Sequence, residues 1–145
     1  MQKALLAVLL LALAGCGGDY AERQEILDQH HPESAESIAQ LKDLTLAPFR
    51  EWQSEEPVSC NSHNLYNARA SLMVTASLAT PEKYGFPTAY DAAQWMLEVA
   101  DAAAEHGCTT IARDLYFKVN AIYRGAGYAR LRDHALTAAQ HLGAS

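Results

Sequence analysis

Residues 92–107 read AAQWMLEVADAAAEHG, and this stretch decides the fold. Its apolar residues recur every three or four positions, which is the period of one face of an α-helix. The stripe that this spacing predicts to be buried consists of Ala92, Trp95, Met96, Val99 and Ala103. Acidic residues occupy the other face, and Gly107 is expected to end the helix in a left-handed conformation. The stretch therefore predicts an amphipathic helix that packs on one side against its neighbours.

Helical spacing continues on both sides of this stretch. Apolar residues recur in the same way over residues 62–81, 111–122 and 131–142. Another amphipathic stretch begins at Ile38, and we expect Pro48 to interrupt it because proline removes a backbone donor. No segment alternates apolar and polar residues as a strand would. Because the predicted turns are short, neighbouring helices must be antiparallel. The predicted fold class is all-α, a small bundle of antiparallel helical hairpins.

Turn and cap residues set the expected ends of these helices. The segment from Lys83 to Thr88 contains a glycine and a proline and is expected to form a turn. Thr88 and Asp91 have the spacing of a capping box at a helix start. Thr109 or Thr110 is expected to cap the helix that follows Gly107.

Charge is distributed unevenly along the chain, whose formal net charge is −6. From Asp19 to Pro57 there are ten acidic and three basic residues, whereas Val58 to Ser145 has seven of each. The sequence contains no cluster of lysines and arginines, which a nucleic-acid-binding surface would need. We therefore expect no nucleic-acid partner.

The first residues have the layout of a secretory signal. One lysine precedes eleven apolar residues, Ala4 to Ala14, a run of about 16 Å as a helix. A bilayer span needs about 20 residues, so this run is too short to cross a membrane. It ends in Leu13-Ala14-Gly15-Cys16, which resembles the lipobox of bacterial lipoproteins. The alternative is an ordinary signal peptide that happens to contain a cysteine.

The lipobox resemblance implies a domain organisation and a location. Residues 1–15 would be removed as a lipoprotein signal peptide, and Cys16 would become the lipidated first residue. Several acyl chains on one residue form a stable membrane anchor. Residues 16–33 are then expected to form an acidic tether, and residues 34–145 an α-helical domain. Because Gly17 stands where an inner-membrane retention signal would carry aspartate, we expect anchorage in the outer membrane, facing the periplasm.

A second resemblance concerns the C-terminal half. The pattern Val99-Ala100-x-x-Ala103-x-x-x-Gly107-x-x-x-x-Ala112-x-x-x-Tyr116 is similar to the small-residue pattern of a tetratricopeptide helical hairpin. The following residues, around Tyr123-Arg-Gly125-Ala-Gly127-Tyr128, resemble a Sel1-like repeat. Both resemblances imply closely packed hairpins with a concave surface. The tetratricopeptide tryptophan position falls on Met96 here, and the alternative is an unrelated small bundle with glycine caps.

The two cysteines after Cys16 are expected to pair. Cys60 lies just before one predicted helix, and Cys108 lies just after the helix that runs back beside it. Both therefore reach the same end of the bundle, and an oxidising compartment favours a disulfide. The alternative is a Cys₂His₂ zinc site that would add His63 and His106. Apart from that alternative, we expect no metal and no cofactor.

The predicted function is binding rather than catalysis. No Ser, His or acidic residue stands in a recognisable nucleophile context, so we expect no enzyme. Aromatic and polar residues on the helix over 111–122 and just after it form the candidate partner-binding set, Tyr116, Lys118, Asn120, Tyr123 and Arg124. The alternative is that the two tyrosines form a second core stripe and that the charged residues face solvent.

We therefore expect a periplasmic adaptor or protein-binding module in an envelope assembly of the secretion or pilus type. Its partners would be a periplasmic or envelope protein and, through the lipid anchor, the membrane. The alternative is an immunity-type lipoprotein that inhibits a periplasmic toxin or hydrolase. An inhibitor of that kind would bind one partner tightly over a standard-size interface.

Overall fold

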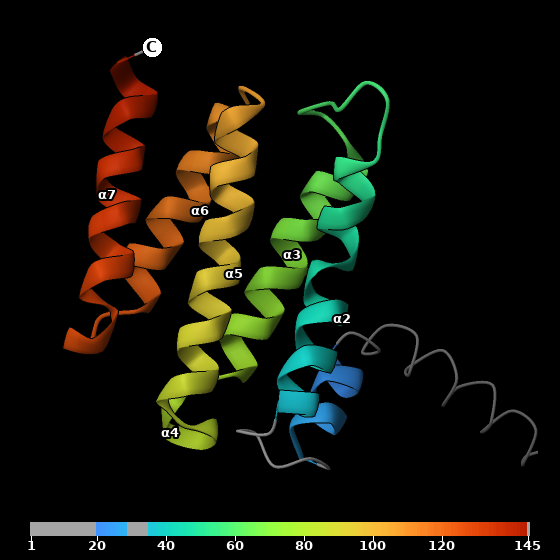
Figure 1. The fold of residues 1–145 in the computed structure, drawn as a ribbon, viewed down its shortest axis with the longest axis vertical. Helices are drawn as coiled ribbons and strands as arrows, with labels where there is room; N and C mark the ends of the chain where they lie inside the picture. The colour runs from blue at the N-terminus through green and yellow to red at the C-terminus, as the bar shows by residue number, and fades with distance from the viewer. Residues whose placement is uncertain (1–19, 29–34, 145) are drawn as a thin grey trace, which may run out of the picture.

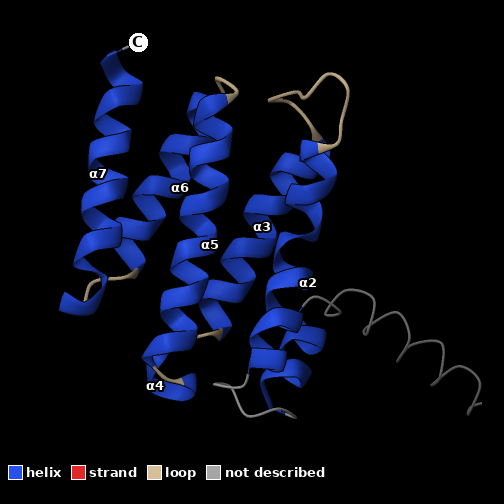
Figure 2. Cartoon of the chain, viewed as in Figure 1, coloured by secondary structure: helices blue, strands red, loops and turns tan. Residues whose placement is uncertain are grey.

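In the computed structural model the helices form a small bundle of successive hairpins. The structure describes residues 20–28 and 35–144, and it contains no strand within those ranges. Residues 20–28 are helical and precede α2. The elements after them are α2 (Ala35–Gln53), α3 (His63–Leu78), α4 (Pro81–Tyr84), α5 (Phe86–Glu105), α6 (Thr109–Ile122), the 3₁₀ helix η1 (Ala126–Tyr128) and α7 (Ala129–Ala144). The all-α prediction is confirmed (Figure 2).

Successive long helices run in opposite directions, as Figure 1 shows. The helix α2 packs on α3, α5 packs on α6, and α6 packs on α7. The contact between α3 and α5 joins these hairpins, and α5 also contacts α2 and α7 directly. In Figure 1, α2 lies at one side of the bundle and α7 at the other. The loops before α3 and before α6 lie at one end of the bundle, where the helices α2 and α5 finish. The short elements α4 and η1 lie at the opposite end, where α3 and α6 finish (Figure 1).

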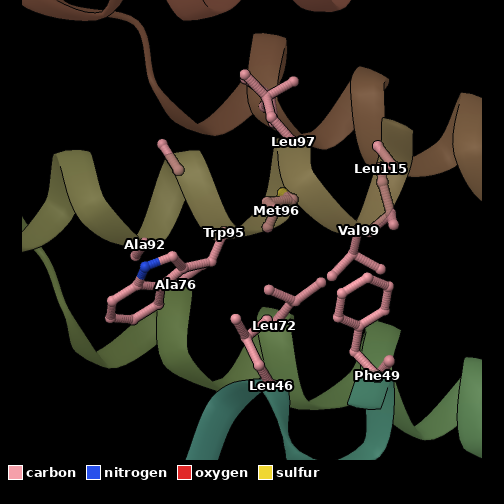
Figure 3. Close-up of a cluster of buried hydrophobic side chains, with 14 of the residues drawn as sticks. Leu46, Phe49, Leu72, Ala76, Ala92, Trp95, Met96, Leu97, Val99 and Leu115 are labelled. Carbon is pink, nitrogen blue, oxygen red and sulfur yellow. The ribbon is translucent and has the colours of Figure 1, made fainter. Parts of the chain in front are cut away.

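The hydrophobic core lies between neighbouring helices, on the faces that the helical spacing predicts to be buried. Leu46 from α2, Leu72 from α3 and Met96 from α5 meet in its centre and are almost fully buried (Figure 3). All five residues of the stripe predicted in α5 are buried. Each large apolar side chain removed from water contributes about 1.5–3 kcal/mol to folding. Burial between hairpins, rather than helix propensity, therefore holds these helices together.

Pro48 does not interrupt α2, contrary to the sequence prediction. The helix runs continuously from Ala35 to Gln53 with the proline inside it. An interior proline costs a helix about 3 kcal/mol. Leu46, Phe49 and Trp52 on either side of it are at most 3 % exposed. Their burial outweighs the cost, since each contributes about 1.5–3 kcal/mol.

The start of α5 also differs from the prediction. The residues expected to form a turn belong to the short helix α4 and to the first turn of α5, with only Gly85 between them. Gly85 has φ +89°, a left-handed value that favours glycine, and Pro87 lies in the first turn of α5. Proline is tolerated there because the first amides of a helix have no intrahelical acceptor. Thr88 is buried inside the helix and does not cap it.

Gly107 has the predicted left-handed conformation, with φ +76°. The helix α6 then starts at Thr109, with Cys108 in the cap position and no side chain capping the first amides. The prediction that Thr109 or Thr110 provides the cap is therefore wrong. The disulfide at Cys108 fixes the chain at the point where a capping side chain would otherwise stabilise the helix start.

Part of the predicted acidic tether belongs to the folded domain. The side chain of Arg23 is 2 % exposed. Its Nε donates to Thr75 Oγ1 of α3 at 3.0 Å, and its Nη2 donates to Ser71 Oγ at 2.5 Å. Leu27 is buried in the same core. The helical segment 20–28 therefore packs on the hairpin formed by α2 and α3, which corrects the prediction for that segment.

The predicted signal peptide and the lipidation residue Cys16 lie outside the described residues. Among the helices that the structure does describe, none combines the length and the apolar character needed to cross a membrane.

Candidate functional site

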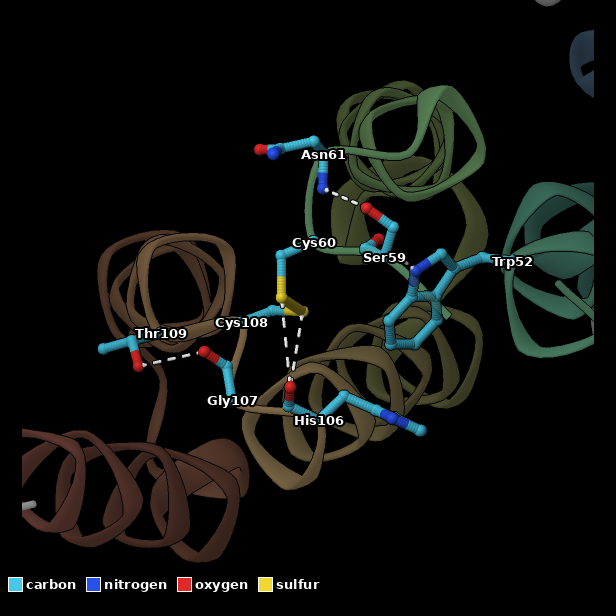
Figure 4. Close-up of a disulfide and its surroundings, with 8 residues drawn as sticks. All are labelled: Trp52, Ser59, Cys60, Asn61, His106, Gly107, Cys108 and Thr109. Carbon is cyan, nitrogen blue, oxygen red and sulfur yellow. Dashed lines mark hydrogen bonds between the residues drawn. A yellow bond between two sulfur atoms is a disulfide. The ribbon is translucent and has the colours of Figure 1, made fainter. Parts of the chain in front are cut away.

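Cys60 and Cys108 are joined by a disulfide, as the sequence predicts. The two Cα atoms are 5.2 Å apart, and the bond links the loop before α3 to the turn between α5 and α6 (Figure 4). Trp52 supports the same loop, since its Nε1 donates to the carbonyl oxygen of Ser59 at 2.9 Å. The disulfide and the Trp52 indole together hold the loop before α3 against the turn between α5 and α6.

The zinc alternative does not describe this end of the molecule. Both sulfur atoms are bonded to each other and are not thiolates that could ligate a metal. His106 packs edge-on against Trp52, with ring centroids 5.1 Å apart, and His63 is an exposed residue at the start of α3. Within the described residues, no group of three or more histidine, cysteine or acidic side chains could hold a metal ion.

Tyr116 is a core residue rather than a surface anchor. It is 2 % exposed, and its hydroxyl donates to Asp101 Oδ1 of α5 at 2.5 Å. The same carboxylate lies 3.0 Å from Nε2 of His134 on α7. Burial, and after it the bond to Asp101, raises the pKa of Tyr116 well above its usual value. This cluster ties α5, α6 and α7 together.

The five predicted partner-binding residues do not form one exposed surface. Tyr123 is 3 % exposed and belongs to the core. Lys118 and Asn120 are half-buried, and the exposed Arg124 donates back to the carbonyl oxygen of Asn120 at 3.3 Å. Because Tyr116 and Tyr123 are both buried, they agree with the alternative of a second core stripe and not with exposed anchors for a partner.

Four aromatic rings pack together at the end of the bundle opposite the disulfide. Tyr128 of η1 lies at their centre, with its ring centroid 4.9 Å from Phe86, 5.3 Å from Tyr123 and 6.2 Å from Tyr90. Gly127 allows this packing, because a Cβ atom on it would lie 2.6 Å from the Phe86 ring. The glycine therefore lets η1 approach the start of α5 closely.

A pocket of about 350 Å³ opens beside these rings. It is bounded by the C-terminal part of α3, by α4 and by the chain that leaves α6. Small and apolar side chains make up much of its wall, and the polar lining consists of Thr80, Glu82, Tyr123, Arg124 and Tyr128. Two of the predicted partner-binding residues, Tyr123 and Arg124, therefore meet at this pocket.

The hydroxyl groups of Tyr123 and Tyr128 are buried without a hydrogen-bond partner among the described residues. Burial, and after it the neighbouring Tyr128, raises the pKa of Tyr123. Burial likewise raises the pKa of Tyr128, with a smaller contribution from the Glu82 carboxylate. Both phenols therefore stay protonated near neutral pH and keep a proton to donate.

Sequence reasoning did not find this pocket. Its polar groups come from three places in the chain: the start of α4, the two residues after α6, and η1. The available signal was the run Tyr123-Arg-Gly125-Ala-Gly127-Tyr128, in which two tyrosines flank two glycines. Glycine allows a backbone to approach a neighbouring group closely, which is what Gly127 does at the Phe86 ring.

No family model matches this chain, and neither the comparison with curated proteins nor the comparison with solved structures found a match.

Proposed function

We propose that this protein is a lipid-anchored envelope module that binds another protein and works as an adaptor in an envelope assembly. The use of its three cysteines carries the proposal. Two of them pair in the folded domain, as suits an oxidising compartment. The third, Cys16, ends a short apolar run in a sequence that resembles a lipobox. A lipid anchor would hold the disulfide-stabilised domain at a membrane surface, where it could bind another protein.

The outer surface of α6 supports the binding role. Phe117 is 71 % exposed on this surface. Arg113 and Arg124 are also exposed on or next to this helix. Exposed aromatic and arginine side chains are the residues that most often dominate binding energy at protein interfaces. We therefore place the partner surface on the exposed side of α6.

The test is site-specific photo-crosslinking in the native envelope. A photoreactive amino acid replaces Phe117 in the full-length chain, and a matched version carries it at Gln140, an exposed position on α7. We expect the Phe117 position to capture components of a membrane assembly and the Gln140 position to capture none of them. A single soluble toxin or hydrolase at Phe117 would replace the adaptor role with the immunity-type role. Equal or absent capture at both positions would contradict a partner surface on α6.

A further inference from the structure

We propose that the face formed by α3 and α6 binds an acidic segment of the partner protein. The inference rests on the proposed function, which places a partner surface on the exposed side of α6, and it adds the chemistry of the partner. Two exposed aromatic side chains and two cations carry it, Tyr66, Phe117, Arg113 and Lys118.

The helices α3 and α6 form the two sides of one elongated surface. In the middle of this surface, Nη1 of Arg69 on α3 lies 3.3 Å from Oδ2 of Asp114 on α6. Near the start of both helices, Tyr66 and Thr110 line the same pocket. Toward their other ends, Ala76 of α3 lines the pocket that also borders the end of α6. Contacts at three levels therefore keep α3 and α6 side by side along their length.

Both helices expose an aromatic ring on this surface. Tyr66 of α3 is 48 % exposed and Phe117 of α6 is 71 % exposed. Arg113 lies one turn before Phe117, so the two side chains are neighbours on the helix surface. Aromatic and arginine side chains close together are the usual centre of a protein interface. A partner segment therefore needs an apolar side chain to cover the Phe117 ring.

The charge of this surface is positive, although the chain as a whole has a formal net charge of −6. The helix α3 contains no acidic residue, and α6 contains one, Asp114, which is paired with Arg69. Arg113 and Lys118 form no ion pair within the ranges that the structure describes. The neighbouring α5, in contrast, carries four acidic residues. Carboxylates on the partner would supply the missing charge partners of α6.

The same charges fit a polypeptide better than an anionic membrane surface. Lipid recognition by basic helices typically uses clusters of about four to eight lysines and arginines. The helix α6 carries only Arg113 and Lys118, with one acidic residue between them. A few cations beside an exposed ring match an acidic, amphipathic segment of a protein instead.

The experiment uses three fluorescein-labelled peptides as probes and the full-length, disulfide-bonded protein as the target. The peptides have about 15 residues, four turns of helix. They share leucines at helical spacing and carry glutamate, glutamine or lysine at the remaining positions. Fluorescence anisotropy measures binding at low and at physiological salt. We expect the glutamate peptide to bind at least about tenfold more tightly than the glutamine peptide, with an affinity that falls as salt is added. We expect no binding of the lysine peptide.

Charge-reversal variants test whether α6 is the binding site. Arg113→Glu and Lys118→Glu should each weaken binding of the glutamate peptide about tenfold. The matched control is Arg130→Glu, which makes the same charge change at an exposed position of α7 and should leave binding unchanged. Phe117→Ala should weaken binding of both the glutamate and the glutamine peptide, because it removes the apolar contact that they share.

Equal affinities for the three peptides, or an equal loss of affinity in Arg130→Glu, would overturn the proposal. So would vesicles of phosphatidylglycerol that bind in place of the glutamate peptide and lose binding in Arg113→Glu, since the face would then be a lipid site. Crosslinking of Phe117 to a second copy of this chain would also overturn it.

Failure of this inference differs from failure of the proposed function. Capture of a neutral or basic segment at Phe117 in the envelope would keep the partner surface and remove the acidic partner. Selective binding of the glutamate peptide without capture in the envelope would keep the acid-binding face and remove the adaptor role.

Discussion

The hydroxyl of Tyr116 donates a hydrogen bond of 2.5 Å to Asp101 Oδ1 and thereby joins α6 to α5. The tyrosine is buried, and the carboxylate also meets His134 of α7. One acidic residue on α5 therefore holds a side chain from each of the next two helices. This contact explains why Tyr116, although tyrosine is common at binding surfaces, belongs to the core instead.

Tyr116→Phe should lower the free energy of unfolding by about 1.5–3 kcal/mol, the usual contribution of a hydrogen bond to a charged group. Urea denaturation of the oxidised protein measures the change. The matched control is Tyr66→Phe, which alters an exposed tyrosine of α3 and should leave stability unchanged. Equal stability of the Tyr116→Phe variant and the unaltered protein would show that the bond to Asp101 adds nothing to folding.

Stability should fall steeply as the pH rises above about 10, the ordinary pKa of tyrosine. Burial raises the pKa of Tyr116, Tyr123 and Tyr128 in the folded protein. The folded state therefore holds protons that the unfolded state releases, so the stability present below pH 10 is lost above it. Urea midpoints at pH 8, 9, 10 and 11 measure the slope. Tyr123→Phe should flatten it, and an unchanged slope in that variant would contradict the role of this residue.

Replacing both Cys60 and Cys108 by alanine should lower stability by about 4 kcal/mol, the loop-entropy value for a closed loop of this length. The two residues are 48 positions apart, so the bond constrains a large part of the unfolded chain. Urea denaturation with and without a reductant measures the effect, with the alanine variant as the reference for the reduced protein. A reductant that leaves the midpoint of the unaltered protein in place would contradict a structural disulfide.

Gly127→Ala should destabilise the end of the bundle at Tyr128 by about 1 kcal/mol, the lower end of the range for overpacked sites, because the Phe86 ring is 43 % exposed and can turn away from the new methyl group. The new methyl group would lie 2.6 Å from Cε2 and 2.7 Å from Cζ of Phe86. Gly125→Ala is the matched control two residues away, where the added Cβ meets Tyr128 at an ordinary 3.6 Å. The double variant Gly127→Ala, Phe86→Ala should be less destabilised by the glycine change than the single variant. Thermal unfolding and near-ultraviolet circular dichroism follow both effects.

The sequence specified the helices from α3 onward better than the N-terminal part. In α5 the apolar stripe has one clear face, and Gly107 marks its end, so the helix and its burial could be predicted. Pro48 could not be placed, because its tolerance depends on burial of Phe49 and Trp52 by α3 and α5. Arg23 could not be placed either, since nothing local shows that a charged residue will be buried against α3.

Cys60 and Cys108 could be paired from topology alone, because each lies at a helix end on the same side of the bundle. The tyrosines of α6 could not be assigned, since a helix between two neighbours buries more than the single face that periodicity reveals. The pocket depends on α4 and η1, two short elements without periodicity of their own.

The use of the three cysteines carries the proposed function, and its most direct test is the intact mass of the protein purified from the membranes of its native host without reduction. We expect a chain that starts at Cys16, carries the added mass of a diacylglycerol and an acyl group, and lacks two hydrogens because Cys60 and Cys108 are paired. An unmodified chain that starts at Met1 and carries free thiols would contradict it.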